Sequence, residues 1–105
     1  MKKIYISGQI TGLKLEEAYR LFHEAETELI KLGHEPVNPM KLIPYDPLFS
    51  WEDYMIKDIE ILLKCDGIYM LRNWGVSRGA RIEHFIAVES NKQTLYQAMI
   101  NIIVN

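Results

Sequence analysis

Short apolar runs alternate with longer amphipathic segments along this chain, and that alternation limits the folds that it can adopt. The expected strands span residues 3–7, 34–38, 66–71 and 93–96. The expected helices span residues 15–32, 51–64 and 78–89. Strands that are separated by helices pair in parallel, because each helix returns the chain to the starting edge of the sheet. The pattern therefore predicts an α/β fold: a small doubly wound parallel sheet, Rossmann- or flavodoxin-like, of four or five strands with helices on both faces.

Apolar spacing and capping residues set the bounds of these helices. The first helix ends at Gly33, and its apolar face comprises Ala18, Leu21, Phe22, Ala25, Leu29 and Leu32. Ser50 is the expected N-cap of the second helix, with Asp53 completing a capping box. The residues that this helix should bury are Trp51, Met55, Ile59, Leu62 and Leu63. Residues 39–50 contain three prolines and are expected to form a loop, whereas residues 98–105 mix strand and helix formers and receive no assignment.

Length, composition and charge exclude several classes of protein. The 105 residues predict a single domain over residues 1–105, and a hydrophobic content of 49% is ordinary for a globular protein. A formal net charge of −2 argues against a nucleic acid polymer as partner, because such binding needs a basic face. No apolar run approaches the ~18 residues of a membrane span. We therefore expect a cytoplasmic protein with no membrane partner that gains stability as a homodimer or higher homo-oligomer.

The sequence offers little for a metal or a cofactor. His23, His34 and His84 lack the spacing of metal ligands. The single cysteine, Cys65, cannot form an internal disulfide and suits a reducing compartment. No Gly-x-x-x-x-Gly-Lys-Ser/Thr motif is present, so an ATPase loop is excluded. We expect no metal site and no cofactor.

Two glycine-containing loops, residues 8–12 and 75–79, each follow an expected strand. They should lie at the carboxyl edge of the sheet, where ligands bind in such folds. Ser77 and Gly79 open the third helix, whose first N–H groups can hold an anion such as phosphate. N-capping alone would also explain Ser77, and tight turns would explain the glycines of the first loop. Gly79 costs about 1 kcal/mol relative to alanine within a helix, which the close approach of a ligand would justify.

Two carboxylates, Asp58 and Glu83, lie on the apolar faces of the second and third helices. A carboxylate at such a position costs free energy unless it is paired, hydrogen-bonded or used in catalysis. A salt bridge to Arg72, Arg78 or Arg81 would explain either acid alone. Two acids that face the ligand-binding edge of one sheet favour a functional interpretation, as a nucleophile, an acid or a base.

A set of motifs, in order and at fixed spacing, extends over almost the whole chain. These motifs are Ile4-Tyr5-Ile6-Ser7-Gly8 with Thr11-Gly12, Val37-Asn38-Pro39, Trp51-x-x-Tyr54-Met55-x-x-Asp58, Cys65-Asp66, Trp74 and Ser77-Arg78-Gly79-Ala80-x-x-Glu83. Together they resemble the nucleoside 2-deoxyribosyltransferase-like superfamily, over residues 4–93. More narrowly, the chain looks like a small, often phage-associated branch and is similar to 2′-deoxynucleoside 5′-monophosphate N-hydrolases.

The resemblance implies a role for each matching residue. Glu83 corresponds to the glutamate that attacks the anomeric carbon of the sugar, and Asp58 to the aspartate that positions the base and shuttles its proton. Tyr5, which strand packing alone would also explain, corresponds to a tyrosine near the sugar and the nucleophile. The residues that the resemblance assigns to substrate or phosphate binding are Ser7, Gly8, Gln9, Ile10, Thr11, Gly12, Asp66, Ser77 and Gly79. A serine at position 77 matches the relatives that hydrolyse 5′-monophosphates, whereas an aspartate is typical of the transferases that use unphosphorylated nucleosides.

Three functional interpretations follow, and the sequence leaves all of them open. The first is cleavage or transfer at the N-glycosidic bond of a nucleoside or deoxynucleoside 5′-monophosphate through a carboxylate nucleophile. The second is a non-catalytic module of the same fold that binds a nucleotide or a nucleotide sugar. The third is an assembly protein in which the two acids are structural. In the first two interpretations the partner is a small-molecule nucleotide or nucleoside.

Overall fold

The structure, a computed structural model, describes residues 1–97. The unassigned segment 98–105 lies outside the described residues. The elements, in chain order, are β1 (Lys3–Ser7), α1 (Leu15–Lys31), β2 (Glu35–Val37), α2 (Pro39–Leu42), α3 (Trp51–Leu63), β3 (Gly67–Met70), the 3-10 helix η1 (Trp74–Val76), α4 (Arg78–Glu89) and β4 (Gln93–Tyr96). Within the described part, no helix is both long enough and apolar enough to cross a membrane.

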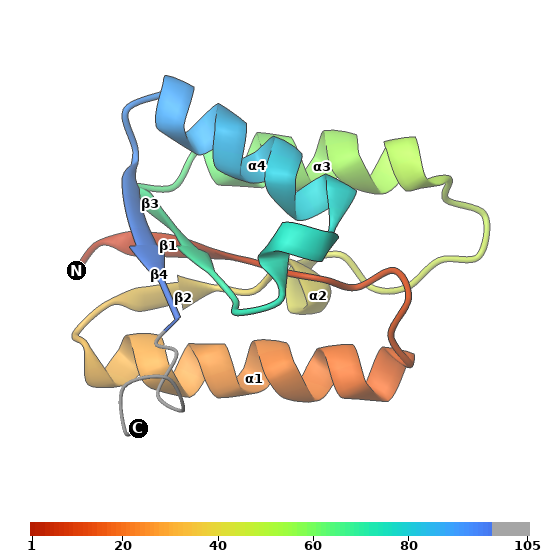
Figure 1. The fold of residues 1–105 in the computed structure, drawn as a ribbon, viewed down its shortest axis with the longest axis horizontal. Coiled ribbons are helices and arrows are strands. Elements are labelled where there is room, and N and C mark those ends of the chain that lie inside the picture. The colour runs from red at the N-terminus through yellow and green to blue at the C-terminus, as the bar shows by residue number, and fades with distance from the viewer. Residues whose placement is uncertain (98–105) are drawn as a thin grey trace.

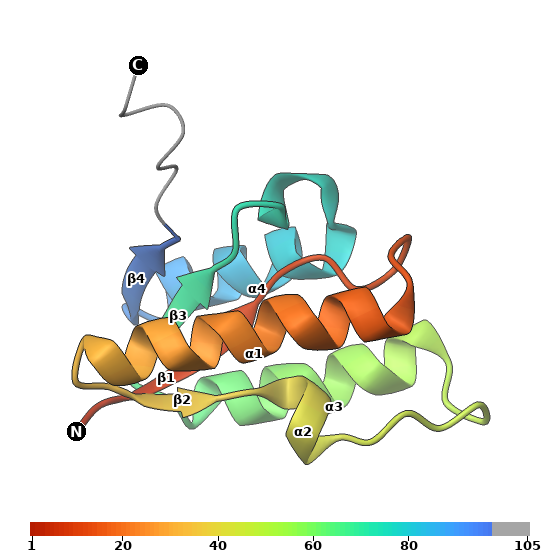
Figure 2. The ribbon, with the colours of Figure 1, turned by 90° about the horizontal axis from the view of Figure 1, so that it is seen from below.

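The four described strands form one parallel sheet in the order β2-β1-β3-β4. Helix α1 covers one face of the sheet, and α3 and α4 lie side by side on the other (Figures 1 and 2). This arrangement confirms the predicted α/β fold with helices on both faces. The chain adds β2 on one side of β1 and β3 on the other, so the strand order reverses between β1 and β3. A crevice at the carboxyl ends of two such strands is the usual ligand site of an open parallel sheet.

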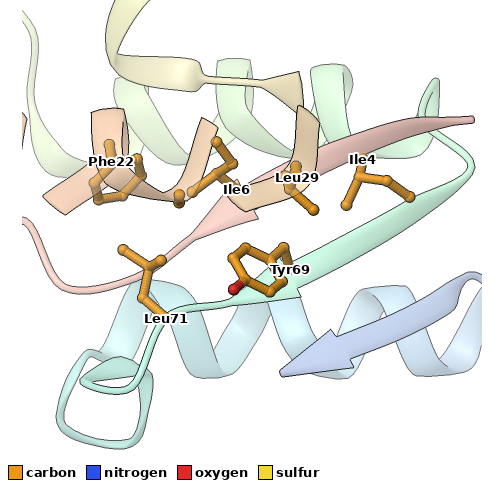
Figure 3. Close-up of a cluster of buried hydrophobic side chains, with 7 residues drawn as sticks. Ile4, Ile6, Phe22, Leu29, Tyr69 and Leu71 are labelled. Atoms are coloured by element: carbon orange, nitrogen blue, oxygen red, sulfur yellow. The ribbon is translucent and has the colours of Figure 1, made fainter. Parts of the chain in front are cut away.

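Each face of the sheet has its own apolar core. On the α1 side, Ile4 and Ile6 pack with Phe22, and the same cluster includes Tyr69 and Leu71 (Figure 3). On the other side the cluster comprises Tyr5, Leu62, Cys65, Ile68, Met70, Ala80 and Ala87. Alternation along β1 thus turns Tyr5 away from Ile4 and Ile6, toward α3 and α4.

The predicted loop over residues 39–50 is wrong for its first four residues, which form α2. Asn38 caps this short helix, because its Oδ1 accepts the N–H of Met40 at 3.0 Å. Pro39 occupies the first helical position, where the missing N–H has no intrahelical acceptor to lose. The prolines at 44 and 47 lie beyond the helix, in a segment without regular structure, as expected.

Some side chains assigned to buried helix faces are exposed. Leu32 is 62% exposed, because α1 has already ended at Lys31. Leu63 is 49% exposed, because its neighbour Leu62 takes the position facing the sheet. Trp51 and Ile59 are only partly buried. The capping box at Ser50, in contrast, is present in full.

Gly8 is the residue of the first loop that cannot carry a side chain. A Cβ there would lie 2.6 Å from Cδ1 and 2.8 Å from Cβ of the buried Leu71. We expect Gly8→Ala to lower the free energy of unfolding by about 1–3 kcal/mol, the usual cost of overpacking. Gly75→Ala is the matched control, because a Cβ at Gly75 meets no atom within 4 Å. Urea denaturation of both variants provides the test, and equal stabilities would contradict this account of Gly8.

Candidate active site

A cavity of about 330 Å³ opens at the carboxyl edge of the sheet, beside the reversal between β1 and β3. Its walls come from the loop after β1, the first turns of α1, the segment from α2 to α3, and the start of α4. Gly8 and Gly79, one from each glycine-containing loop, both line it. The two loops therefore meet at one cavity, as the strand order requires.

Glu83 lies on the face of α4 that packs against the sheet and is only 5% exposed. Its Oε1 accepts a hydrogen bond from Ser7 Oγ at 2.6 Å, and its Oε2 accepts one from Tyr5 Oη at 2.9 Å. Both donors come from β1, at positions that share one face of the strand. Two hydroxyl groups therefore hold this carboxyl group. The guanidinium of Arg78, one of the arginines considered as a partner, stacks instead on the ring of Trp51 at 3.9 Å.

Asp58 approaches Glu83 from the neighbouring helix, α3. The carboxyl groups of Asp58 and Glu83 lie close enough to share a hydrogen bond. Two carboxyl groups can share such a bond only if one of them carries a proton. The structure thus brings together the two acids that the sequence placed on separate helices.

Burial raises the pKa of both acids. Desolvation, and then repulsion from Asp58, raises the pKa of Glu83 to about 8. Desolvation raises the pKa of Asp58 to about 6. Between these values the pair holds one proton and one negative charge. The pKa of Tyr5 is raised well above its ordinary value by burial and by Glu83, so its hydroxyl stays protonated and remains a donor.

The N-terminus of α4 forms a second polar part of the cavity. Ser77 Oγ accepts the N–H of Ala80 at 3.1 Å, and the Ser77 carbonyl accepts the N–H of Arg81 at 3.0 Å. The N–H groups of Arg78 and Gly79 belong to the first turn and have no acceptor within the helix. These groups, with the positive end of the helix dipole, suit an anion.

The packing of Gly79 against α3 offers a structural explanation for a glycine at this position, which the sequence did not reveal. A Cβ at this position would lie 3.1 Å from Sδ of Met55 on α3, which is tighter than an ordinary contact. A side chain at position 79 would therefore require the flexible Met55 side chain to move by a few tenths of an ångström.

The structure gathers most of the predicted site residues around the cavity. Those that line it are Tyr5, Ser7, Gly8, Ile10, Thr11, Asp58, Ser77, Gly79 and Glu83. Gln9 and Gly12 shape the loop beside the cavity. The backbone N–H of Gln9 donates to Asn73 Oδ1 at 3.0 Å, and Gly12 has a φ of 95° that favours glycine.

Asp66 is the site residue that the structure separates from the others. It precedes β3 and so lies at the amino edge of the sheet, whereas the cavity is at the carboxyl edge. Its carboxylate accepts the backbone N–H of Lys3 at 2.8 Å, which ties β1 to the start of β3. This contact corrects the assignment of Asp66 to substrate binding and gives it a structural role.

Sequence reasoning missed the aromatic wall of the cavity. This wall consists of Tyr19, Phe22, Tyr45, Phe49, Trp51 and Tyr54. A signal was available, since four of the six fall within the ten residues 45–54. The prolines of residues 39–50 predict a loop, and a loop has no periodicity that shows which of its side chains face a cavity.

Metal chemistry has no ligand set within residues 1–97. The structure contains no group of three or more His, Cys, Asp or Glu side chains in that range that could hold a metal ion. The polar groups that line the cavity include the two carboxyl groups, the hydroxyls of Tyr5, Ser7 and Thr11, the phenols of the aromatic wall, and the first turn of α4.

Comparison with known proteins gives a family and a fold. The family model described as a domain of unknown function (DUF4406) matches residues 2–96. A comparison with curated proteins gives no match. Among solved structures, a 2-deoxyribosyltransferase from Bacillus psychrosaccharolyticus is 21% identical with a TM-score of 0.67, over 90% of this chain and 70% of that one.

Two further structures share this fold. A 2-deoxyribosyltransferase from Leishmania mexicana is 21% identical with a TM-score of 0.65, over 91% of this chain and 63% of that one. The CMP N-glycosidase BcmB from Clostridium botulinum is 17% identical with a TM-score of 0.58, over 90% of this chain and 67% of that one. The resemblance drawn from the motifs is thereby confirmed at the level of the fold.

Glu83→Gln is expected to remove a pH dependence of stability. The pKa of Glu83 rises from 4.5 to about 8 on folding, so in this interval the folded chain holds a proton that the unfolded chain has lost. The stability due to this group is full at low pH, and the free energy of unfolding falls as pH rises toward 8. The slope for one proton is at most about 1.4 kcal/mol per pH unit. The variant should flatten the slope between about pH 6 and 8 and become the more stable protein at the alkaline end, whereas below about pH 6 the raised pKa of Asp58 still contributes a slope.

Urea denaturation across this pH interval measures the effect. Glu89→Gln is the matched control, because Glu89 is exposed on the same helix, and it should keep the wild-type slope. A wild-type stability that rises with pH through this interval would contradict the protonated, buried state of Glu83.

Proposed function

We propose that this chain, which belongs to the DUF4406 family, cleaves or transfers at the N-glycosidic bond of a nucleoside or deoxynucleoside 5′-monophosphate. The observation that carries the proposal is the buried Glu83 carboxyl group, held by Tyr5 and Ser7 beside Asp58. The cavity volume of about 330 Å³ is within the range of about 300–1,000 Å³ for small-molecule sites. The fold is shared with 2-deoxyribosyltransferases and with a CMP N-glycosidase, whose names describe chemistry at this bond.

In the proposed first step, the Glu83 carboxylate attacks C1′ of the sugar. A new O–C1′ bond forms and the C1′–N bond breaks, with its electron pair passing to the base. The protonated Asp58 supplies a proton to the leaving base and becomes a carboxylate. Tyr5 and Ser7 hold the two Glu83 oxygens, so the attacking group is already oriented before substrate arrives.

In the proposed second step, an acceptor attacks C1′ and the ester bond to Glu83 breaks. If the acceptor is water, Asp58 takes its proton, and the net reaction converts nucleotide and water into free base and sugar phosphate. If the acceptor is a second base, Asp58 takes a proton from its nitrogen, and a new nucleotide forms. Both routes return the acid pair to its starting charge, with one proton for the two groups.

The 5′-phosphate is assigned to the N-terminus of α4. The N–H groups of Arg78 and Gly79 and the helix dipole favour an anion there, and Ser77 adds no negative charge of its own. Arg78 and Arg81 lie in the same first turn without lining the cavity, and the Arg78 guanidinium stacks on the ring of Trp51, which does line it. This charge distribution supports a 5′-monophosphate over an unphosphorylated nucleoside.

The proposal predicts base release that depends on Glu83. Purified protein is incubated with each deoxynucleoside and ribonucleoside 5′-monophosphate, and free base is followed by chromatography. Wild type should release base from at least one of them, and Glu83→Gln should be slower by at least about 10³-fold, because it lacks the attacking oxygen anion. Circular dichroism and urea denaturation confirm that the variant is folded.

Parallel reactions with an added second base reveal transfer as a newly formed nucleotide. Binding of nucleotides with neither release nor transfer would reject the enzyme and favour a binding module. If saturating nucleotides give no rise in melting temperature either, the site has no nucleotide ligand.

Ser77 provides a second test, of the phosphate assignment. Ser77→Asp and Ser77→Asn both keep a side-chain oxygen that can cap α4, and they differ by one negative charge. We expect Ser77→Asp to lower kcat/KM for the 5′-monophosphate at least about tenfold relative to Ser77→Asn, because two negative charges then face each other. Activity on the unphosphorylated nucleoside should not show this difference. Equal values for the two variants on the monophosphate would place the phosphate elsewhere.

A further inference from the structure

We infer that the cavity recognises the base of its nucleotide mainly by apolar and aromatic contact, so that it accepts different bases with little discrimination. This inference rests on the proposed function, which supplies the nucleotide. It follows from the aromatic rings that line the cavity and from the small number of hydrogen-bonding groups that are free to contact a base. A base edge is read by hydrogen bonds from side chains and backbone groups, and its flat faces are bound by stacking on aromatic rings.

The side chains of the cavity are poor readers of a base edge. Within the described part of the chain, no Asn, Gln, Arg, Lys or His lines the cavity. The hydroxyls of Tyr5 and Ser7 donate to Glu83, that of Ser77 accepts the N–H of Ala80, and Thr11 is exposed in the loop after β1. Asp58 is placed to protonate the leaving nitrogen, which every nucleotide has. These polar groups thus serve the sugar and the bond that breaks, and they carry little information about which base is present.

In residues 43–50, which contribute Tyr45 and Phe49 to the aromatic wall, the backbone N–H groups other than that of Tyr45 are already hydrogen-bonded or absent. The N–H of Ile43 donates to the Pro39 carbonyl at 2.9 Å, and that of Phe49 to the Asp46 carbonyl at 3.1 Å. The N–H groups of Leu48 and Ser50 donate to aspartate side chains within or just after the segment. Two of the remaining positions are prolines, which have no N–H.

The hydroxyl of Tyr54 is also hydrogen-bonded within the protein. Its hydroxyl accepts the N–H of Asp46 at 2.6 Å and donates to the carbonyl of the same residue at 2.9 Å. Its ring meets that of Phe49 edge to face, with centroids 5.2 Å apart. The Tyr54 hydroxyl is therefore bonded to the Asp46 backbone, and the rings of Tyr45 and Phe49 from this segment line the cavity.

The other phenols of the wall lie toward solvent. Tyr19 is 40% exposed and Tyr45 is 63% exposed. A hydrogen bond from an exposed hydroxyl to a base replaces one to water, so its loss leaves no buried group unpaired. Sites built on apolar contact separate similar ligands by about 10–200-fold, whereas sites that bury hydrogen-bonding groups reach about 10⁴-fold or more. The cavity belongs to the first kind.

Binding to Glu83→Gln, which stops turnover, provides the experiment. The probes are the four deoxynucleoside 5′-monophosphates and 2-deoxyribose 5-phosphate, which lacks a base, each measured by calorimetry. Asp58→Asn is a second variant with impaired turnover in case the first does not fold. We expect the four nucleotide Kd values to lie within about 100-fold of one another. Each should be at least about tenfold tighter than that of the sugar phosphate, because the wall contributes stacking.

The outcomes separate this inference from the proposed function. A preference for one base over every other by more than about 10³-fold would overturn the inference, even if that nucleotide is cleaved by wild type. Nucleotides that bind no better than the sugar phosphate, or that do not bind, would overturn it as well. If all four nucleotides bind with similar Kd values and wild type neither releases nor transfers the base, the inference is supported and the enzyme is rejected.

Tyr45→Phe and Tyr19→Phe give an independent test, since each keeps the ring and removes the hydroxyl. The ratios of Kd between bases should change by less than about threefold, whatever the effect on overall affinity, because an exposed hydroxyl contributes little discrimination. A tenfold or larger change in any ratio would identify that phenol as a reader of the base and contradict the inference.

Discussion

A carboxyl group that is 5% exposed, on a helix face that packs against a sheet, is the constraint on which the rest of this site depends. Burial of an unpaired carboxylate is unfavourable in free energy, and two features of the fold reduce this penalty. Strand alternation turns Tyr5 and Ser7 of β1 toward Glu83, so that each carboxyl oxygen accepts a hydroxyl. Packing of α3 against α4 brings Asp58 close to Glu83, and this proximity, with burial, raises the pKa of Glu83 so that it can hold a proton.

The cavity has two different sides. The polar side is made by regular elements, β1, α3 and α4, whose side-chain directions are fixed by the backbone. The apolar side takes four of its rings from the helices α1 and α3, and two, Tyr45 and Phe49, from the segment with two prolines. Regular elements thus place the polar groups and most of the rings, and the irregular segment adds the other two rings.

The predictability of the structure from sequence follows this division. The strands, the helix bounds and the orientation of Tyr5 were predictable, because they depend on periodicity and on local caps such as Ser50 and Ser77. Helix α2 was not predicted, because three nearby prolines outweighed one favourable cap at Asn38. Asp66 was assigned to the site through its motif, yet its backbone position at the amino edge of β3 decides against it. The shared proton of Asp58 and Glu83 depends on the distance between two helices, which no spacing along one chain encodes.

The charge state of the acid pair has a consequence for the proposed reaction. Because the pKa of Glu83 lies above that of Asp58, the resting pair keeps its proton mostly on Glu83. Attack on C1′ needs the opposite arrangement, with Glu83 ionised and Asp58 protonated. Bond breaking develops positive charge at C1′, next to Glu83, and negative charge on the base, next to Asp58. Both changes draw the proton toward Asp58, so the buried pair stabilises the transition state more than the bound substrate, which is the condition for catalysis.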